Sequence, residues 1–188
     1  MPGPSAPASA EARRLCVLGM GNILYHDEGV GVYAAHYLRA AFRFTPEIEI
    51  VDGAALGFGL MSYFTSDRRL VVLDALLTTA PPGTVYRLPE EQLLDLDPTM
   101  RPTAHEVEPI ELLKLTTLVG QAPGMVLLGI VPADVTQLRL GLSTEIAQAF
   151  PHLVEAAIAE LRGGGVAVDA VRQIGLEDVI EDMVMRTW

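Results

Sequence analysis

Strand-like and helix-like segments alternate along most of this chain, and the alternation restricts the folds that are open to it. Residues 14–20, 70–74 and 124–131 are continuous apolar runs, which are typical of parallel strands buried on both faces. Residues 29–43 and 143–162 instead repeat apolar side chains at helical spacing. We therefore predict an α/β fold: a three-layer sandwich whose mainly parallel, twisted sheet of about five strands has helices on both faces.

Weaker patterns fill the gaps between these elements. Residues 47–52 alternate as a strand does, and residues 84–88 are expected to form a fourth strand near an edge of the sheet. Residues 57–65 are a candidate short helix, and residues 105–119 are expected to become helical after their start. Between them, the Pro- and acid-rich residues 89–104 predict an irregular loop with one helical turn.

Composition divides the chain into three parts. Residues 1–13 are rich in Pro, Ala and Ser and are expected to be a flexible tail, residues 14–165 a single α/β domain, and residues 166–188 a C-terminal extension. The extension holds a candidate strand and helix, and its Met183, Met185 and Trp188 could dock on the domain or on a partner. No run approaches the roughly 18 apolar residues of a membrane span, and no secretory leader is recognisable, so we expect no membrane association and a cytoplasmic location.

Charge and cysteine content exclude several functions. The 188 residues carry a net charge of −11, and the 13 Lys and Arg residues are scattered, whereas phosphate binding needs clustered basic side chains. A nucleic-acid partner is therefore not expected. The single cysteine, Cys16, excludes an intramolecular disulfide and a thiolate cluster. Its apolar neighbours predict an inert core thiol.

Residues 17–31 are the most informative stretch for function. They join an apolar strand to a helix-like segment through a turn that contains several glycines and the adjacent acids Asp27 and Glu28. Burying two carboxylates at the end of a strand is costly unless they have partners. The carboxyl ends of the strands are also where open α/β sheets bind their ligands. The turn is therefore the best candidate for part of the functional site.

Three polar residues are expected to meet at this edge of the sheet. Glu28 follows the first strand, Asp74 ends the strand of residues 70–74, and His105 opens a helix after a Pro-rich loop. Two carboxylates and an imidazole suit a divalent transition metal such as nickel, zinc or copper. The long separations between these residues form no local metal-binding signature, so the spacing alone does not establish the site.

Simpler roles stay open for each of these residues. Asp74 could cap the following turn, and His105 could be a polar residue at a helix start. Asp27 or Glu28 could serve as a helix N-cap, which would leave the other acid to face the site. His26, within the turn, is a minor candidate ligand.

A nucleotide site is a weaker alternative. Gly19 and Gly21 after a strand, with Asp52 ending the second strand, resemble part of a dinucleotide fingerprint. The third glycine is missing, because position 24 is Leu, and two acids at this helix N-terminus would repel a pyrophosphate. We therefore expect no nucleotide partner. A serine-hydrolase elbow is also absent, since the segment Gly141-Leu142-Ser143-Thr144-Glu145 lacks its final glycine.

The turn resembles the opening motif of the maturation endopeptidases of nickel–iron hydrogenases. The motif is Gly19-Met20-Gly21-Asn22-Ile23-Leu24, two residues, then Asp27-Glu28-Gly29-Val30-Gly31. Later landmarks of that family follow in the same order: Asp52-Gly53, Asp74, Thr103-Ala104-His105, Gly129-Ile130-Val131-Pro132 and Gly141-Leu142-Ser143. The similarity spans about residues 14–162.

The resemblance implies a particular chemistry. Glu28, Asp74 and His105 occupy the positions of the family's metal-binding residues, so they are also the expected catalytic residues. The implied substrate is a hydrogenase large-subunit precursor already loaded with nickel, from which a short C-terminal extension is removed after a basic residue. Nickel would thus arrive with the substrate, and zinc or cadmium in a crystal would be a surrogate for it.

Four further residues are expected to take part in substrate recognition: Asn22, Asp27, Asp52 and Gly53. The family often continues Asp-Gly with Gly-Thr, whereas this chain has Ala54-Ala55, which leaves the choice of hydrogenase open. A non-catalytic nickel-dependent assembly factor on the same scaffold is the main alternative function, and a peptidase acting on another protein is a further one.

Overall fold

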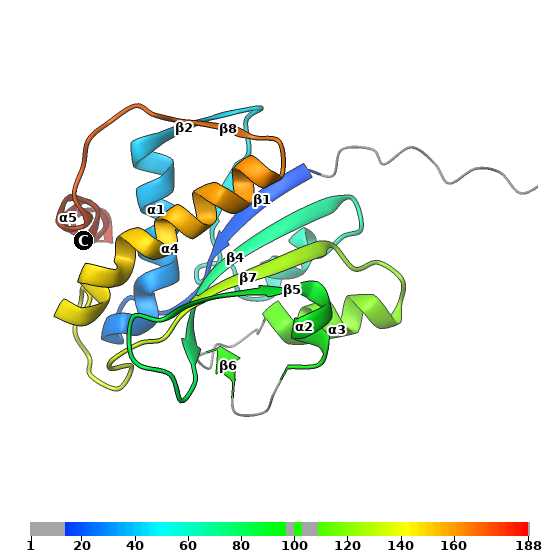
Figure 1. Cartoon of the computed structure of the whole chain (residues 1–188), viewed down its shortest axis with the longest axis horizontal. Helices are drawn as coiled ribbons and strands as arrows, with labels where there is room; N and C mark the ends of the chain where they lie inside the picture. Colours follow the sequence, from blue (N-terminus) through cyan, green and yellow to red (C-terminus); the bar gives the residue numbers. More distant parts are fainter. Residues whose placement is uncertain (1–13, 97–99, 103–108, 188) are drawn as a thin grey trace, which may run out of the picture.

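A computed structural model describes residues 14–96, 100–102 and 109–187 of the chain (Figure 1). Five strands form the path of the main sheet, in the order β3 (Glu49–Asp52), β1 (Arg14–Gly19), β4 (Arg68–Leu77), β7 (Gly124–Ile130) and β5 (Val85–Pro89). The first four strands are parallel, and β5 runs antiparallel to β7 at the edge. The predicted edge strand and mainly parallel sheet are therefore confirmed.

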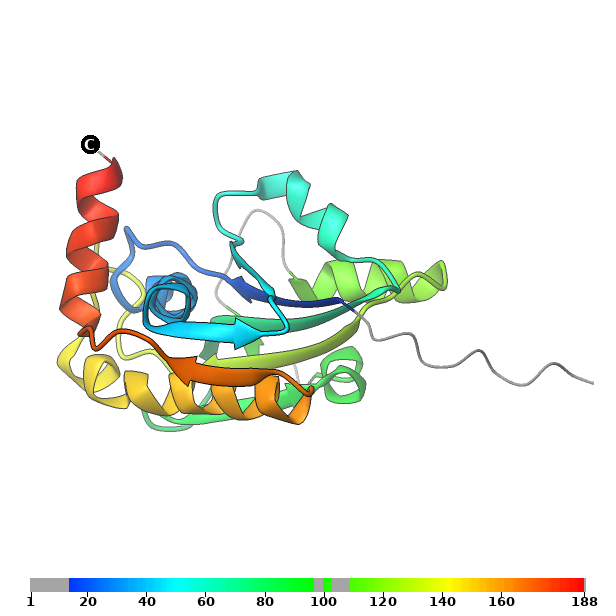
Figure 2. The same ribbon diagram turned by 90° about the horizontal axis from the view of Figure 1, so that it is seen from above.

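Helices cover both faces of this sheet (Figure 2). On one face lie α1 (Val30–Ala41) and α4 (Thr144–Gly163), and on the other lie the 3₁₀ helix η2 (Gly57–Tyr63) and α3 (Pro109–Leu118). The short α2 (Glu90–Leu94) adds its buried Leu93 to the second core. The three-layer prediction is confirmed.

A hydrophobic core lies on each face of the sheet. Each strand contributes side chains to the two cores in turn, because its successive side chains point to opposite faces. Val17 and Val71 belong to the core under α1 and α4, whereas Leu18 and Val72 belong to the core under α3. Cys16 also lies in the second core and is fully buried, as predicted. Continuous apolar runs in the sequence thus reflect strands covered on both sides.

The C-terminal residues pack on the domain. β8 (Ala167–Ala170) pairs antiparallel with β2 (Phe42–Thr45) in a separate two-stranded sheet, and α5 (Leu176–Thr187) lies beside α1. Val168, Val179 and Met183 belong to the core under α1 and α4. The helix expected over residues 29–43 ends earlier, at Ala41, because the chain there extends into β2.

One strand boundary also differs from expectation. β4 does not end at Asp74 but continues to Leu77, where its last residues pair with β6 (Arg101–Pro102). The parallel pairing of β4 with β1, however, stops at Leu73. Asp74 is thus the first residue of β4 beyond the end of β1, although it is not the end of the strand.

The order of the strands creates a topological switch point between β1 and β4. β1 leads through α1 to β3 on one side, whereas β4 leads to β5 and β7 on the other. Open α/β sheets bind ligands outside the carboxyl ends of their strands at such a switch point. We call this place, at the carboxyl ends of β1 and β4, the crevice. In the described part of the chain, no helix is long and apolar enough to cross a membrane.

Candidate active site

The glycine turn after β1 folds tightly against itself and against β4. Gly21 has φ 124°, and a Cβ atom there would lie 1.9 Å from the Glu28 carbonyl oxygen. A Cβ atom on Gly31 would lie 2.1 Å from the Leu73 carbonyl oxygen. Side chains at either position would push the turn away from the sheet, so glycine is what lets Glu28 sit beside β4.

Glu28 and Asp74 lie on the two sides of the switch point. Glu28 belongs to the 3₁₀ helix η1 (His26–Gly29), which contacts β4, and only 8% of the residue is exposed. Asp74 is fully buried, and its Oδ1 accepts a 2.8 Å hydrogen bond from the Ala75 N–H. The alternative that Asp74 caps a following turn is wrong, because β4 continues to Leu77. Glu28 thus lies in a 3₁₀ helix packed against β4, the strand that carries Asp74.

Asp27, next to Glu28 in the sequence, is bound to the loop between β7 and α4. It is fully buried, and its carboxylate accepts hydrogen bonds from the N–H groups of Ala133 (3.0 Å), Asp134 (3.0 Å) and Ser143 (2.6 Å), and from the Ser143 hydroxyl (2.9 Å). The expectation that Asp27 or Glu28 caps α1 is wrong, since Gly29 is the N-cap and no side chain caps that helix. Asp27 instead accepts hydrogen bonds from Ser143, the N-cap residue of α4, and so fixes the start of that helix.

Further bonds tie the turn to the loop between β7 and α4. The His26 N–H donates to the Arg139 carbonyl (2.9 Å), and the Arg139 N–H donates to the Leu24 carbonyl (3.0 Å). The His26 Nδ1 lies 3.1 Å from the Gly141 carbonyl oxygen, and the residue has φ 53°. A non-glycine residue in the left-handed region of φ is held there by its surroundings. His26 therefore connects the glycine turn to the β7–α4 loop.

Two of the residues predicted to recognise substrate have local roles. The Asn22 Oδ1 accepts a hydrogen bond from the Leu24 N–H (3.0 Å), which shapes the turn. The Gly53 N–H donates to the Gly19 carbonyl (2.8 Å), and a Cβ atom at Gly53 would lie 2.4 Å from the Met20 sulfur. Both therefore have a structural reason for their residue type.

Asp52 is paired with a histidine that the sequence pattern did not single out. Its Oδ2 lies 3.3 Å from the His36 Nε2, and the His36 Nδ1 lies 2.9 Å from an Arg39 guanidinium nitrogen. The Asp52 Oδ1 is shielded from water and has no hydrogen-bond partner among the described residues. The spacing of His36 and Arg39 on one helix face was the available signal, but their link to β3 depends on the tertiary fold.

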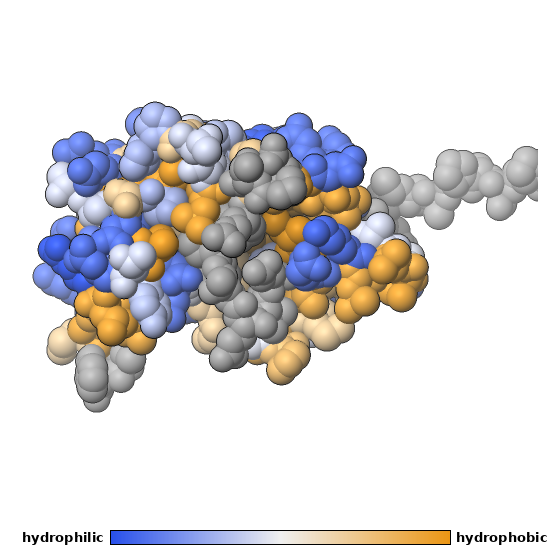
Figure 3. All heavy atoms as spheres, turned by 90° about the horizontal axis from the view of Figure 1, so that it is seen from below, coloured by the Kyte–Doolittle hydropathy of each residue, from blue (hydrophilic) through white to orange (hydrophobic). Residues whose placement is uncertain are grey.

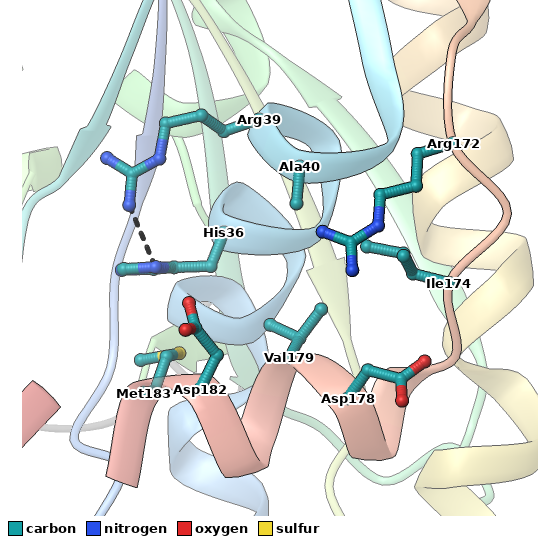
Figure 4. A pocket seen from close by; sticks show the side chains of 9 residues that line it. All are labelled: His36, Arg39, Ala40, Arg172, Ile174, Asp178, Val179, Asp182 and Met183. Atoms are coloured by element: carbon teal, nitrogen blue, oxygen red, sulfur yellow. Dashed lines mark hydrogen bonds between the residues drawn. The ribbon is translucent and has the colours of Figure 1, made fainter. Parts of the chain in front are cut away.

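His36 and Arg39 also line a cavity of about 320 Å³ between α1 and α5 (Figure 4). Arg172 and the α5 residues Asp178 and Asp182 complete its polar lining. Figure 4 shows the two arginines above α5, with the hydrogen bond between Arg39 and His36. Neither Glu28 nor Asp74 lines this cavity, so it is separate from the crevice between β1 and β4.

The third expected metal ligand, His105, lies outside the described residues. Within the described ranges, no group of three His, Cys, Asp or Glu side chains could hold a metal ion by itself. The ligand set Glu28, Asp74 and His105 therefore stays a prediction. Cys16 offers no alternative nucleophile, because burial and the nearby Glu49 carboxylate raise the pKa of its thiol to about 12.

Comparison with known proteins identifies the family of this chain. The family model described as hydrogenase maturation protease, HycI, matches residues 32–160. This chain belongs to the hydrogenase maturation protease family. The family is one of peptide hydrolases, and the resemblance seen in the glycine turn and the later landmarks is confirmed.

Individual relatives agree with this family. A hydrogenase expression/formation protein, HupD, from Rhizobium leguminosarum bv. viciae is 30% identical over 171 residues, which cover 90% of this chain and 84% of the relative. The hydrogenase 2 maturation protease of Escherichia coli K12 is 28% identical over 155 residues, or 81% of this chain and 93% of that protein. The structure of the E. coli hydrogenase maturating endopeptidase HybD superposes with a TM-score of 0.70 at 26% identity, covering 84% of this chain and 97% of that one.

Proposed function

We propose that this maturation protease removes a short C-terminal extension from the nickel-loaded precursor of a nickel–iron hydrogenase large subunit. The observation that supports the proposal is the position of the buried Glu28 and Asp74 on two packed elements, η1 and β4, next to the switch point between β1 and β4, in a chain of this family. The reaction is hydrolysis of one peptide bond by an aspartic-type, metal-dependent endopeptidase, and the expected compartment is the cytoplasm.

The carboxylates would act by binding the nickel that the precursor carries. Carboxylate and imidazole groups both ligate divalent transition metals, so Glu28 and Asp74, with His105, suit that ion. Binding it would hold the scissile bond at a fixed position beside the crevice, and the metal would lower the pKa of a bound water. The rigid backbone around both acids is suited to positioning, because the glycine turn and β4 leave little freedom.

Asp52 is the described residue best placed to add substrate selectivity. It ends β3 next to β1, and its side chain is 30% exposed, so the carboxylate can meet a hydrogen-bond donor from the substrate. A basic side chain before the scissile bond would supply such a donor. Asn22, Gly53 and Asp27 would then support recognition by shaping the turn, rather than by touching the substrate.

The test is intact mass spectrometry of a nickel-loaded large-subunit precursor incubated with the protein. We expect loss of one discrete C-terminal peptide, and we expect Asp74→Asn to slow this loss about 100-fold or more. Asp169→Asn changes an exposed carboxylate on β8 and is the matched control, with an expected rate within about twofold of wild type. An uncut precursor, with nickel content and partner verified, would instead favour the non-catalytic assembly factor.

Nickel dependence is tested with the same assay. Because the ligands would act through the substrate's metal, precursor without nickel should remain uncut at equal enzyme concentration. Cleavage of nickel-free precursor at the wild-type rate would show that nickel recognition is wrong, although the protease activity would stand.

A further inference from the structure

Large apolar side chains are exposed on the loops that surround the crevice. Leu24 in the glycine turn is 55% exposed, and Leu138 and Leu140 in the loop between β7 and α4 are 75% and 42% exposed. We call these three residues the rim patch. Figure 3 shows hydrophobic surface in several places on the face of the molecule seen from below, so exposed apolar area is not confined to one end.

The rim patch is held on a preformed framework. Tyr25 and Arg139 form a parallel β-bridge, and the Arg139 N–H donates a backbone hydrogen bond to the Leu24 carbonyl (3.0 Å). Leu24 precedes Tyr25, and Leu138 and Leu140 flank Arg139, so the bridge places the three leucines on two adjoining segments. Their exposure is therefore a fixed property of two bonded loops, and presenting apolar surface on a rigid frame lowers the entropy cost of binding.

The rim patch is continuous with the candidate active site. Leu24 lies in the same turn as Glu28, and the Asp27 carboxylate bonds both ends of the loop that carries Leu138 and Leu140. A protein whose nickel reaches Glu28 and Asp74 must cover these loops. Clusters of exposed apolar side chains beside a binding site are typical of protein–protein contacts.

We propose that the rim patch binds an apolar surface of the hydrogenase large-subunit precursor. This contact would add to the free energy of binding that the cleavage site supplies. This inference rests on the proposed function. The occupant is the precursor, because the rim patch lies on the two hydrogen-bonded loops next to the candidate site, and the precursor must be bound there to be cut. Docking beside the cleavage site would also explain how a globular precursor is held while one short segment is cut.

The test compares the double variant Leu138→Ser and Leu140→Ser with Leu118→Ser. Leu118 is 84% exposed at the end of α3, near the opposite edge of the sheet, so it controls for loss of exposed apolar surface. Cleavage rates are measured over a range of nickel-loaded precursor concentrations, and direct binding is measured by titration. We expect the double variant to raise KM and Kd about tenfold or more with kcat within about twofold, and the control to change neither.

The outcomes separate this inference from the proposed function. If the double variant cleaves and binds as wild type does, the docking inference is wrong and the protease function stands. If wild type binds the precursor through the rim patch without cutting it, docking stands and the protease function fails. If sedimentation shows a wild-type dimer that the double variant loses, the patch joins two copies of this chain and the inference is overturned.

Discussion

Adjacent acids in the glycine turn have opposite surroundings. The carboxylate of Asp27 is buried and accepts four hydrogen bonds from the β7–α4 loop and Ser143, whereas Glu28 lies at the crevice. We predict that Asp27→Asn lowers the free energy of unfolding by about 2 kcal/mol, because an amide N–H would face backbone donors. Glu28→Gln should keep most of the stability but abolish cleavage. Urea denaturation and the cleavage assay check both, and a stable Asp27→Asn beside an unstable Glu28→Gln would reverse the two roles.

At the scale of elements, one glutamate anchors α4 to the sheet. The buried Glu160 carboxylate accepts from Arg69 of β4 (2.6 Å) and from Arg87 of β5 (2.8 Å). Burial opposes its ionisation, but the two guanidinium groups hold its pKa below the ordinary 4.5. Glu160→Gln should therefore cost about 1–2 kcal/mol of unfolding free energy at pH 7, and the exposed Glu155→Gln on the same helix about 0.5 kcal/mol or less.

The same anchor predicts how stability depends on pH. A carboxyl whose pKa is lower in the folded state stabilises the fold above its unfolded pKa, and this contribution is lost as the pH falls through the folded pKa. The difference in stability between wild type and Glu160→Gln should therefore shrink below pH 4.5. Denaturation curves collected from pH 7 to pH 3 measure it, and a difference that does not change with pH would contradict the ionic role.

At the scale of the whole molecule, the C-terminal extension is part of the domain. Met183 of α5 is 7% exposed within the core under α1 and α4, whereas Met185 is 79% exposed. We predict that Met183→Ala lowers the free energy of unfolding by about 2–3 kcal/mol, and that Met185→Ala changes it by less than about 0.5 kcal/mol. Equal effects in thermal or urea unfolding would mean that α5 does not stabilise the domain.

Local patterns were sufficient for the elements of the parallel sheet. The apolar runs predicted β1, β4 and β7, since a strand covered on both faces needs apolar residues throughout. Ser143 precedes the helical pattern of α4, and its hydroxyl oxygen accepts a bond from the Ile146 N–H at 3.3 Å, as a short polar side chain does at an N-cap. The sequence also predicts where the candidate site lies, because parallel strands share the edge at which they end.

Tertiary structure decided what depends on partners far apart in the chain. Nothing in residues 42–45 indicates pairing with residues 167–170, and nothing near Asp52 indicates His36. Two adjacent acids are indistinguishable as a sequence pattern, yet the 3₁₀ turn directs Asp27 to the β7–α4 loop and leaves Glu28 at the crevice. Burial is encoded locally by the spacing of apolar residues, whereas a hydrogen-bond partner is determined only when distant segments of the chain are brought together.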